Sequence, residues 1–418
     1  MKNGMKQTEI GEIPVEWEVV KAGEVFINVS DKNHPEEELL SVTQDNGVVL
    51  RSEQERRVVM PDGSTAGYKL VKKGDFIISL RSFQGGLEYS SYQGLVSPAY
   101  TVLRGTTKMD DAFLTFLFKE KNFIDRLSSS VVGIRDGKQI NFRDFKHVYI
   151  QLPPLPEQRK IAEILSTLDE KMAVIDEQLA QTQELKKGLM QRLLTKGTGH
   201  TQFKESPLGE IPASWEVRLL DDVTKRGSGH TPSKNFPEYY DGGIKWISLA
   251  DSNKLDNGWI RETKTNISSL GIKNSSATLH PKGTVLLSRD AGIGKSAVMY
   301  EDMAVSQHFI TWTCNGKINN WFLYYYLQLN KPLFERIAAG STIKTIGLPF
   351  FKKFSILVPT PFEQEKIAEI LTTVDEKIGV LQAKKAQYHT LKKGLMQQLL
   401  TGQRRVRVAA SAETAVLV

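Results

Sequence analysis

The strongest constraint on this chain is an internal repeat. The segment PEQRKIAEILSTLDEKM, residues 156–172, returns as FEQEKIAEILTTVDEKI, residues 362–378, displaced by 206 positions. With the same displacement, LKKGLMQRLLT at residues 185–195 returns as LKKGLMQQLLT at residues 391–401. Because two copies of one unit in a single polypeptide form a pseudo-dimer, whatever one copy does is expected at two places a fixed distance apart.

The repeated segments have the apolar spacing of a coiled-coil helix. Apolar residues recur at alternating steps of four and three, which is a period of 3.5. Such a seam on a helix of about 40 residues, roughly 60 Å long, is too narrow and too long for an ordinary core and predicts a partner helix. Both seams skip at matching points, near Thr182 in the first copy and near Tyr388 in the second, so the copies are expected to pair antiparallel. Beyond the skip the pattern continues through Leu185, Leu189 and Leu193 in the first copy and through Leu391, Leu395 and Leu399 in the second. The expected seam residues are Ile161, Leu165, Leu168, Met172, Ile175, Leu179, Ile367, Leu371, Val374, Ile378 and Leu381.

Proline and glycine predict where these helices begin and end. The lead-ins QLPPLPEQ and LVPTPFEQ place prolines where a first helical turn tolerates them. Gly197, Gly199 and Gly402 follow the last periodic residues, as helix-ending glycines do.

The stretches outside the helices predict two globular blocks of mixed α/β structure. Each has a strand, a Gly-rich loop, a further strand, a helix (residues 111–127 or 320–337) and a Gly-led loop, GIRDGKQIN or GSTIKTIG. The predicted fold is therefore two α/β domains joined by a long antiparallel two-helix coiled coil with pseudo-two-fold symmetry. The expected boundaries are residues 1–150 and 201–356 for the domains, 151–200 and 357–403 for the helices, and 404–418 for a tail.

Composition indicates a soluble protein with a polyanionic partner. The net charge is +7, the isoelectric point is about 9.1 and the mean hydropathy is -0.30. The apolar runs are far shorter than the roughly 20 residues of a membrane span, and the first residues lack the apolar core of a secretory signal. A cytoplasmic location is expected. The single cysteine, Cys314, is interpreted as a buried, inert thiol.

No catalytic or metal-binding constellation is found in the sequence. AGIGKS at residues 291–296 resembles a phosphate-binding loop, but Arg289 stands where that motif needs glycine and a strand, not a helix, is expected to follow. SPAY at residues 97–100 and its counterpart SQHF at residues 306–309 are interpreted as strand turns. The seven histidines lack metal-ligand spacing.

The loops of both blocks are rich in side chains that read or hold DNA. Arginine can fork onto guanine, glutamine onto adenine, and aspartate can accept from cytosine, while serine and lysine more often hold phosphate. For any single residue, solvated turn chemistry is an equal alternative, but the loops recur at matched positions in both halves. The candidates are Gln44, Asn46, Arg81, Ser82, Gln84, Arg135, Lys138 and Gln139 in the first block and Asp251, Asn253, Arg289, Asp290, Lys295, Ser296, Ser341, Thr342 and Lys344 in the second.

Together, LPPLPEQRKIAEIL, LKKGLMQRLLT, the two GEIPxxW openings and GSTIKTIG make the chain similar to the specificity subunit of type I restriction-modification systems. The resemblance implies two target recognition domains, each reading half of a bipartite double-stranded DNA site in the major groove, with the coiled coil setting the unread spacer. It also implies a non-catalytic subunit without cofactors of its own. Two modification subunits would carry S-adenosylmethionine and methylate adenine, and restriction subunits would bring ATP-driven translocation and cleavage with Mg.

Two other functions remain open from the residues alone. One is a coiled-coil adaptor with peptide-binding loops, which a steep loss of DNA affinity with salt would exclude. The other is a stand-alone DNA-modifying enzyme, which no motif supports. GIRDGKQIN lacks the Ser-Thr pair of GSTIKTIG, and the tail is expected to be a disordered end or a contact with the first domain.

Overall fold

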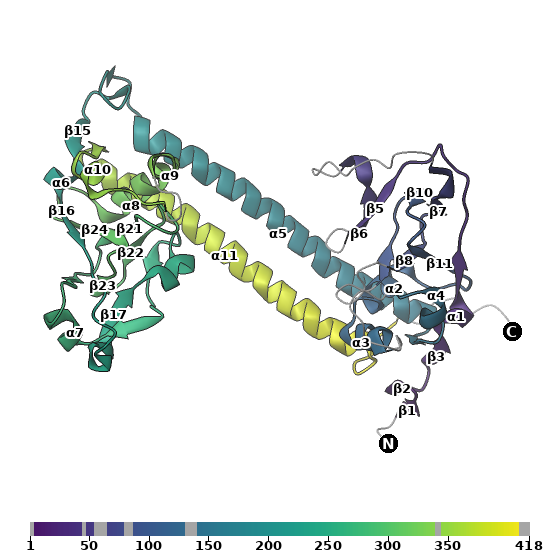
Figure 1. The fold of residues 1–418 in the computed structure, drawn as a ribbon. Coiled ribbons are helices and arrows are strands. Elements are labelled where there is room, and N and C mark those ends of the chain that lie inside the picture. The colour runs from purple at the N-terminus through teal and green to yellow at the C-terminus, as the bar shows by residue number, and fades with distance from the viewer. Residues whose placement is uncertain are drawn as a thin grey trace. The chain divides into compact units, whose positions relative to one another are not determined.

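A computed structural model of the chain describes residues 4–43, 47–53, 65–78, 87–129, 140–338 and 344–408. By their contacts the residues form two compact units. The first combines Met1–Asp176 with Lys384–Val418, and the second is Glu177–Ala383. Each unit therefore contains one globular block and a segment of each of two long helices, α5 (Leu155–Lys196) and α11 (Pro361–Leu400) (Figure 1).

The first block is built on a four-stranded antiparallel sheet. Its order is β4 (Phe26–Val29), β11 (Thr101–Gly105), β8 (Phe76–Ile78) and β9 (Leu87–Tyr89). Along β8, Phe76 and Ile78 join one apolar cluster and Ile77 joins another. Because successive residues of a strand point to opposite faces, this unbroken apolar run marks a strand that is covered on both sides.

Smaller elements complete the first block. They are β1 (Met5–Thr8), β2 (Gly11–Pro14), β3 (Glu18–Lys21), α1 (Ala22–Val25), β5 (Leu40–Thr43), β6 (Gly47–Leu50), the 3₁₀ turns Arg51–Glu53 and Thr65–Gly67, β7 (Lys69–Val71), β10 (Gly94–Val96), α4 (Phe142–Phe145) and β12 (Tyr149–Leu152). β1 pairs with β2, β5 with β6, β7 with β10, and β3 with β12, all antiparallel.

The second block repeats this sheet order with one more strand. Its order is β16 (Thr224–Ser228), β24 (Phe309–Cys314), β21 (Val285–Ser288), β22 (Ser296–Met299) and β18 (Trp259–Ile260). Side chains of β21 again alternate between two apolar clusters, with Val285 and Leu287 in one and Leu286 in the other. The shared skeleton predicted from the sequence is therefore present in both blocks.

A second sheet in this block runs β19 (Thr265–Ile267), β17 (Tyr240–Ile247), β23 (Met303–Val305) and β20 (Leu279–His280). The other elements are β13 (Phe203–Lys204), β14 (Ile211–Pro212), β15 (Glu216–Leu219), α6 (Leu220–Val223), the 3₁₀ turns Pro237–Tyr239 and Leu249–Lys254, α7 (Ser269–Lys273), α10 (Leu348–Lys352) and β25 (Ser355–Val358).

The single helix expected in each block is in fact two helices. Residues 111–127 contain α2 (Asp111–Leu117) and α3 (Lys121–Ser129), and residues 320–337 contain α8 (Asn320–Leu329) and α9 (Lys331–Ile337). The prediction was wrong because it overlooked local capping. A Glu120 carboxylate oxygen accepts a hydrogen bond from the Phe123 N–H and starts a new helix. In the second block, Pro332 lies in the first turn of α9, where proline is tolerated, but it cannot continue the helix that ends at Leu329.

Within each unit the two long helices run antiparallel, as the repeat predicted. In the first unit, Lys392 of α11 pairs with Asp169 of α5, and Lys385 pairs with Asp176. A step of seven residues forward on α5 thus accompanies a step of seven backward on α11. In the second unit, Lys186 near the end of α5 pairs with Asp375 near the start of α11. The predicted fold class of mixed α/β blocks with a long antiparallel helix pair is confirmed.

The predicted seam is only partly a helix-to-helix seam. Leu168, Ile175 and Leu381 are buried, while Met172, Leu179, Val374 and Ile378 are half-buried. The outermost seam residues belong to the domain cores: Ile161 and Leu165 join the first core, and Ile367 and Leu371 join the second. The helix ends are therefore parts of the globular blocks.

Beyond the skip, the expected continuation of the seam was wrong at Leu185 and Leu391, whereas Leu189 and Leu395 are half-buried and Leu193 and Leu399 are buried. Leu185 is 54% exposed and Leu391 is 48% exposed. A straight helix with 3.6 residues per turn drifts away from a 3.5 repeat. After the skip the inward positions of the first copy are Lys186, Leu189 and Leu193, of which Lys186 reaches Asp375 on the neighbouring helix.

Each block is joined to a long helix by the same indole-carboxylate contact. In the first unit, Trp17 Nε1–H donates to Glu157 Oε2 at 3.1 Å. In the second, Trp215 Nε1–H donates to Glu363 Oε2 at 2.8 Å. The repeated GEIPxxW motif and the repeated PEQ and FEQ segments therefore supply the tryptophan and the glutamate of this joint between block and helix.

A helix-ending glycine closes each joint. Gly197 follows α5 with φ 67° and Gly402 follows α11 with φ 73°. A Cβ at Gly197 would lie 2.4 Å from Glu363 Oε1, and one at Gly402 would lie 2.4 Å from Pro14 Cδ. Only glycine fits both the left-handed backbone and the space.

Candidate nucleic-acid interface

Many candidate DNA contacts lie outside the described residues. They are Gln44, Asn46, Arg81, Ser82, Gln84, Arg135, Lys138, Gln139, Ser341 and Thr342. All the candidates that the structure describes belong to the second block.

The loops of the second block come together as a network. Arg289 N–H donates to His308 O at 2.9 Å, and Ile346 N–H donates to Arg289 O at 3.0 Å. Lys295 Nζ donates to Ser252 O at 3.0 Å. Four segments that are distant in sequence, around residues 250, 290, 308 and 345, are thereby held in one place. Hydrogen bonds therefore join these loops of the second block to one another.

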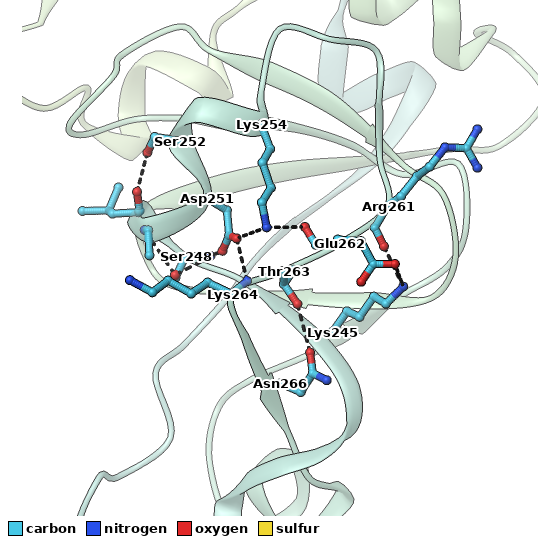
Figure 2. Close-up of polar contacts among 12 residues, drawn as sticks. Lys245, Ser248, Asp251, Ser252, Lys254, Arg261, Glu262, Thr263, Lys264 and Asn266 are labelled. Carbon is cyan, nitrogen blue, oxygen red and sulfur yellow. Dashed lines mark hydrogen bonds and ion pairs between the residues drawn. The ribbon is translucent and has the colours of Figure 1, made fainter. Parts of the chain in front are cut away.

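Asp251 is buried among these loops, and Figure 2 shows its polar contacts. Its side chain is fully buried, and its carboxylate accepts hydrogen bonds from the Ser248 N–H, the Lys264 N–H and Lys254 Nζ at 3.1, 2.7 and 3.1 Å. Its expected role as a direct DNA contact is corrected, because a buried carboxylate with these donors has no access to a base edge. Asp251 instead orders the loop that carries Asn253.

Figure 2 also shows polar contacts of the neighbouring segment between β18 and β19. Lys254 Nζ reaches Glu262 O at 3.1 Å, and Lys245 Nζ reaches Arg261 O at 2.6 Å. Thr263 Oγ1 donates to Asn266 Oδ1 at 3.0 Å. Lysine side chains that could hold phosphate are here used to fix backbone carbonyls.

Ser296 is likewise a structural residue. It is fully buried, its N–H donates to Asp256 Oδ1 at 2.9 Å, and its hydroxyl accepts from Gln328 Nε2 at 2.8 Å. Its expected DNA contact is corrected for the same reason as that of Asp251. The residues after AGIGKS form β22, so the strand expected there in place of a phosphate-binding helix is confirmed.

The remaining candidates of this block stay at the surface. Asn253 and Lys344 are exposed, and Arg289, Asp290 and Lys295 are half-buried. Arg289 Nε is enclosed and has no hydrogen-bond partner among the described residues. Asp290 accepts hydrogen bonds from His308 Nδ1 at 2.5 Å and from the Thr345 hydroxyl. Asp290 therefore organises its neighbours as well as facing the surface.

Sequence reasoning missed the turn of Gln307 and His308. SQHF was interpreted only as a strand turn, which is correct for its backbone, since Phe309 N–H donates to Ser306 O at 3.2 Å. Gln307 is exposed and accepts a 2.6 Å hydrogen bond from Thr231 Oγ1. The signal available in the sequence was the contrast with SPAY in the other half, which has no amide or imidazole at these positions.

This turn lies at the rim of a pocket of about 430 Å³. The pocket has aromatic walls from Tyr240 and Trp246 and polar side chains from Thr231, Ser248 and His308, and Lys234 stands at its rim. Trp246 is itself fixed, because its Nε1–H donates to His230 O at 3.1 Å.

Among the described residues, no group of three or more His, Cys, Asp or Glu is placed to hold a metal ion. Burial raises the pKa of Cys314 to about 12, which keeps its thiol protonated at neutral pH. Within the same residues, none of the helices combines the length and the apolar character that a membrane crossing requires.

Comparison with known proteins agrees with this architecture. The family model described as "Type I restriction modification DNA specificity domain" matches the chain twice, at residues 14–184 and 212–388. Each match covers one globular block and most of the helix that follows it.

Curated relatives match over nearly full length. A putative type I restriction enzyme MjaX specificity subunit from Methanocaldococcus jannaschii is 28% identical over 97% of this chain and 98% of its own. The type I restriction enzyme MjaVIII specificity subunit of the same organism is 27% identical over 94% of each chain.

Solved structures share the fold at lower identity. A type I restriction-modification system S subunit from M. genitalium has a TM-score of 0.56 at 14% identity and covers 96% of this chain and 99% of its own. A chain from a structural study of assembly and conformational transition in a type I restriction-modification system has a TM-score of 0.60 at 16% identity, with 94% and 99% covered. With two family matches that together cover most of its length, the chain belongs to the type I restriction modification DNA specificity family.

Proposed function

We propose that this chain, as a DNA specificity subunit of a type I restriction-modification system, reads a bipartite DNA site with one half-site for each globular domain. The observation that carries the proposal is the double family match at residues 14–184 and 212–388, which falls on two blocks whose main sheets share four corresponding strands. Two similar scaffolds with different loops suit two different half-sites.

The proposed division of the chain follows the repeat. Recognition domains occupy residues 1–150 and 201–356, helical segments occupy residues 151–200 and 357–403, and residues 404–418 form a tail. Arg405, within that tail, pairs with Glu157 and Glu16, which supports a contact of the tail with the first domain.

The long helices are proposed to set the spacer between half-sites. At about 1.5 Å per residue, the 42 residues of α5 extend roughly 63 Å. A continuous helix shared by both domains suits a spacer on the order of one to two turns of B-DNA.

Catalysis belongs to other subunits in this family, and the proposed partners follow from that. Two modification subunits would bind S-adenosylmethionine and methylate adenine. Restriction subunits would use ATP and Mg. The chain itself would bind double-stranded DNA without a cofactor, in the cytoplasm.

The proposed DNA contacts combine phosphate and base readers. In the second domain they are Asn253, Arg289, Asp290, Lys295 and Lys344, together with Ser341 and Thr342. In the first domain they are Gln44, Asn46, Arg81, Ser82, Gln84, Arg135, Lys138 and Gln139.

A block exchange tests the division into two readers. Residues 209–356 of the second domain are replaced by the corresponding residues of a relative, and methylated adenines are mapped across the host genome. One half of the methylated sequence should change and the other should stay. A change in both halves would contradict the modular reading.

An insertion tests the spacer. Four residues, about one helical turn, are added to α5 beside Thr182, whose hydroxyl donates to Gln178 O within the helix. The spacer should change while both half-site sequences persist. A matched control inserts the same residues after Arg405, where neither spacer nor sequence should change.

A further inference from the structure

We infer that Gln307 reads an adenine in the half-site of the second domain, and that Thr231, His308 and Asp290 hold its amide in the reading orientation. The inference rests on the proposed DNA function and adds a residue and a base to it.

The backbone that carries Gln307 is firmly anchored. It lies in the turn between β23 and β24, closed by the hydrogen bond from Phe309 N–H to Ser306 O. Ser306 N–H donates to Ile247 O at 2.9 Å, and His308 O accepts from Arg289 N–H at 2.9 Å. Two separate segments thus fix the turn, which connects the two sheets of this block, as a reading site requires.

The amide of Gln307 is oriented from both sides. Thr231 Oγ1 donates to its Oε1 at 2.6 Å, and its Nε2 lies 3.4 Å from His308 Nε2. A carboxylate only accepts hydrogen bonds, so His308 Nδ1 carries a proton toward Asp290 Oδ2 at 2.5 Å. In the neutral imidazole, Nε2 is then an acceptor for the Gln307 amide N–H.

Beyond these two contacts, the exposed amide of Gln307 has two further hydrogen-bonding positions. Its Nε2 has a second N–H, and its Oε1 has a second lone pair. Adenine offers the complementary pair in the major groove, because its N6 amino group donates and its N7 accepts. Guanine offers two acceptors at these atoms, so the oriented amide discriminates between the two purines.

The exposure and surroundings of this network indicate a ligand. Fixing a glutamine side chain costs rotamer entropy, yet a threonine, a histidine and an aspartate hold this exposed one in place. The exposed Lys234 lies on the adjoining pocket, and the exposed Lys344 adjoins Thr345, which donates to Asp290. Such cations suit phosphates on either side of a base contact.

The first domain has the same turn without the reader. Tyr100 N–H donates to Ser97 O at 3.0 Å, as Phe309 N–H does to Ser306 O. Its two tip residues are Pro98 and Ala99, which offer no side-chain donor or acceptor. The turn belongs to the scaffold, whereas the amide is specific to the second half-site.

The test maps methylated adenines in hosts carrying the full complex with Gln307→Ala. Discrimination at one base pair of the second half-site should fall roughly 5- to 150-fold, and the first half-site should be unchanged. Gln202→Ala, an exposed glutamine of the same unit, is the matched control and should leave both half-sites intact. The inference is wrong if the variant methylates with wild-type selectivity. It is also wrong if the base pair at which the variant loses selectivity is not A·T in the wild-type site.

The positioning residues are tested by the same readout. Thr231→Val and His308→Ala should relax the same base pair as Gln307→Ala, by a smaller factor, with melting temperatures close to wild type. Relaxation at other positions, or a uniform loss of methylation, would assign these residues a structural role and overturn the inference. If the block exchange changes both halves of the methylated sequence and Gln307→Ala has no effect, the proposed function itself is rejected, and not only the role of Gln307.

Discussion

The two joints between domain and helix have the same indole-carboxylate contact, but an arginine completes one joint and a histidine completes the other. Arg405 binds Glu157 through Nε and Nη2, at 2.7 and 2.8 Å, whereas His200 binds Glu363 at 2.8 Å. Each partner stands three residues after the helix-ending glycine. The comparison teaches that the repeat preserves a bonded carboxylate under a buried tryptophan and leaves the residue that completes it free to vary.

The largest expected effect tests whether the two copies contribute equally to their cores. Leu165 and Leu371 occupy equivalent positions, and both are completely buried. Replacing either by alanine should lower the free energy of unfolding by about 2–5 kcal/mol. Denaturant unfolding of the purified chain measures the change. Leu185→Ala, at an exposed position, is the control and should stay within about 0.5 kcal/mol, and a silent Leu165→Ala would break the equivalence of the two copies.

The joints should differ when their tryptophans are replaced by phenylalanine. After Trp17→Phe, Glu157 Oε2 keeps its hydrogen bond from Arg405, whereas after Trp215→Phe the described residues offer Glu363 Oε2 no other donor. A buried carboxylate oxygen without a donor costs about 1–3 kcal/mol, so Trp215→Phe should be the more destabilising by roughly that amount. Thermal melting of both variants decides it, and equal losses would contradict the account.

The contacts between the long helices and the domains sharpen the comparison further. Asp375 accepts from Lys186 and from the Tyr325 hydroxyl at 2.8 Å, while the equivalent Asp169 pairs with Lys392. Burial, followed by the nearby Asp375 charge, raises the pKa of Tyr325, so its hydroxyl stays a donor. Asp375→Ala should cost about 1 kcal/mol more than Asp169→Ala, which as a more exposed pair should lose about 0–1 kcal/mol. Chemical denaturation curves of the two variants provide the measurement, and a reversed order would show that the tyrosine contact adds nothing.

The smallest expected effect is a pH dependence of the second joint. Burial alone would raise the pKa of Glu363, but hydrogen bonds from Thr198 N–H, Trp215 and His200 outweigh it and hold the pKa below its ordinary value near 4.5. The ionised carboxylate therefore stabilises the fold above that value, and the contribution is lost as pH falls through the lower folded pKa. The melting temperature of Glu363→Gln should lie below wild type by a constant amount from pH 7 down to about 4.5, and the difference should shrink only as the pH falls further below 4.5. A difference that already shrinks above pH 4.5, or that stays constant well below it, would contradict the lowered pKa.

The sequence predicted the repeated parts well, because their signals are periodic or positional. The heptad seams predict paired helices, and the matching skips in the two copies predict that the helices run antiparallel. Glycines such as Gly197 mark where the helices end. The misses have local physical causes. Leu185 is exposed because a helix of 3.6 residues per turn gradually rotates away from a 3.5-residue repeat. Glu120 caps the first turn of α3, so a separate helix follows α2.

The recognition surface was harder to predict because it depends on burial and on contacts across loops. Asp251 and Ser296 have the side chains of DNA contacts, yet the fold uses them to hold loops together. Gln307 has equally ordinary chemistry in the sequence and gains meaning only from Thr231 and His308 beside it. Side-chain type alone does not distinguish a residue that contacts DNA from one that holds loops together.

The first core is assembled from both ends of the polypeptide. Leu399 and Leu400 pack in the cluster that contains Trp17 and Ile13, whereas the second unit is one uninterrupted segment, Glu177–Ala383. During synthesis the ribosome releases every residue of the second unit before it releases the last pieces of the first. The amino-terminal domain, although made first, must therefore wait for the final helix before its core can close, and a prematurely terminated chain would leave that domain unfinished.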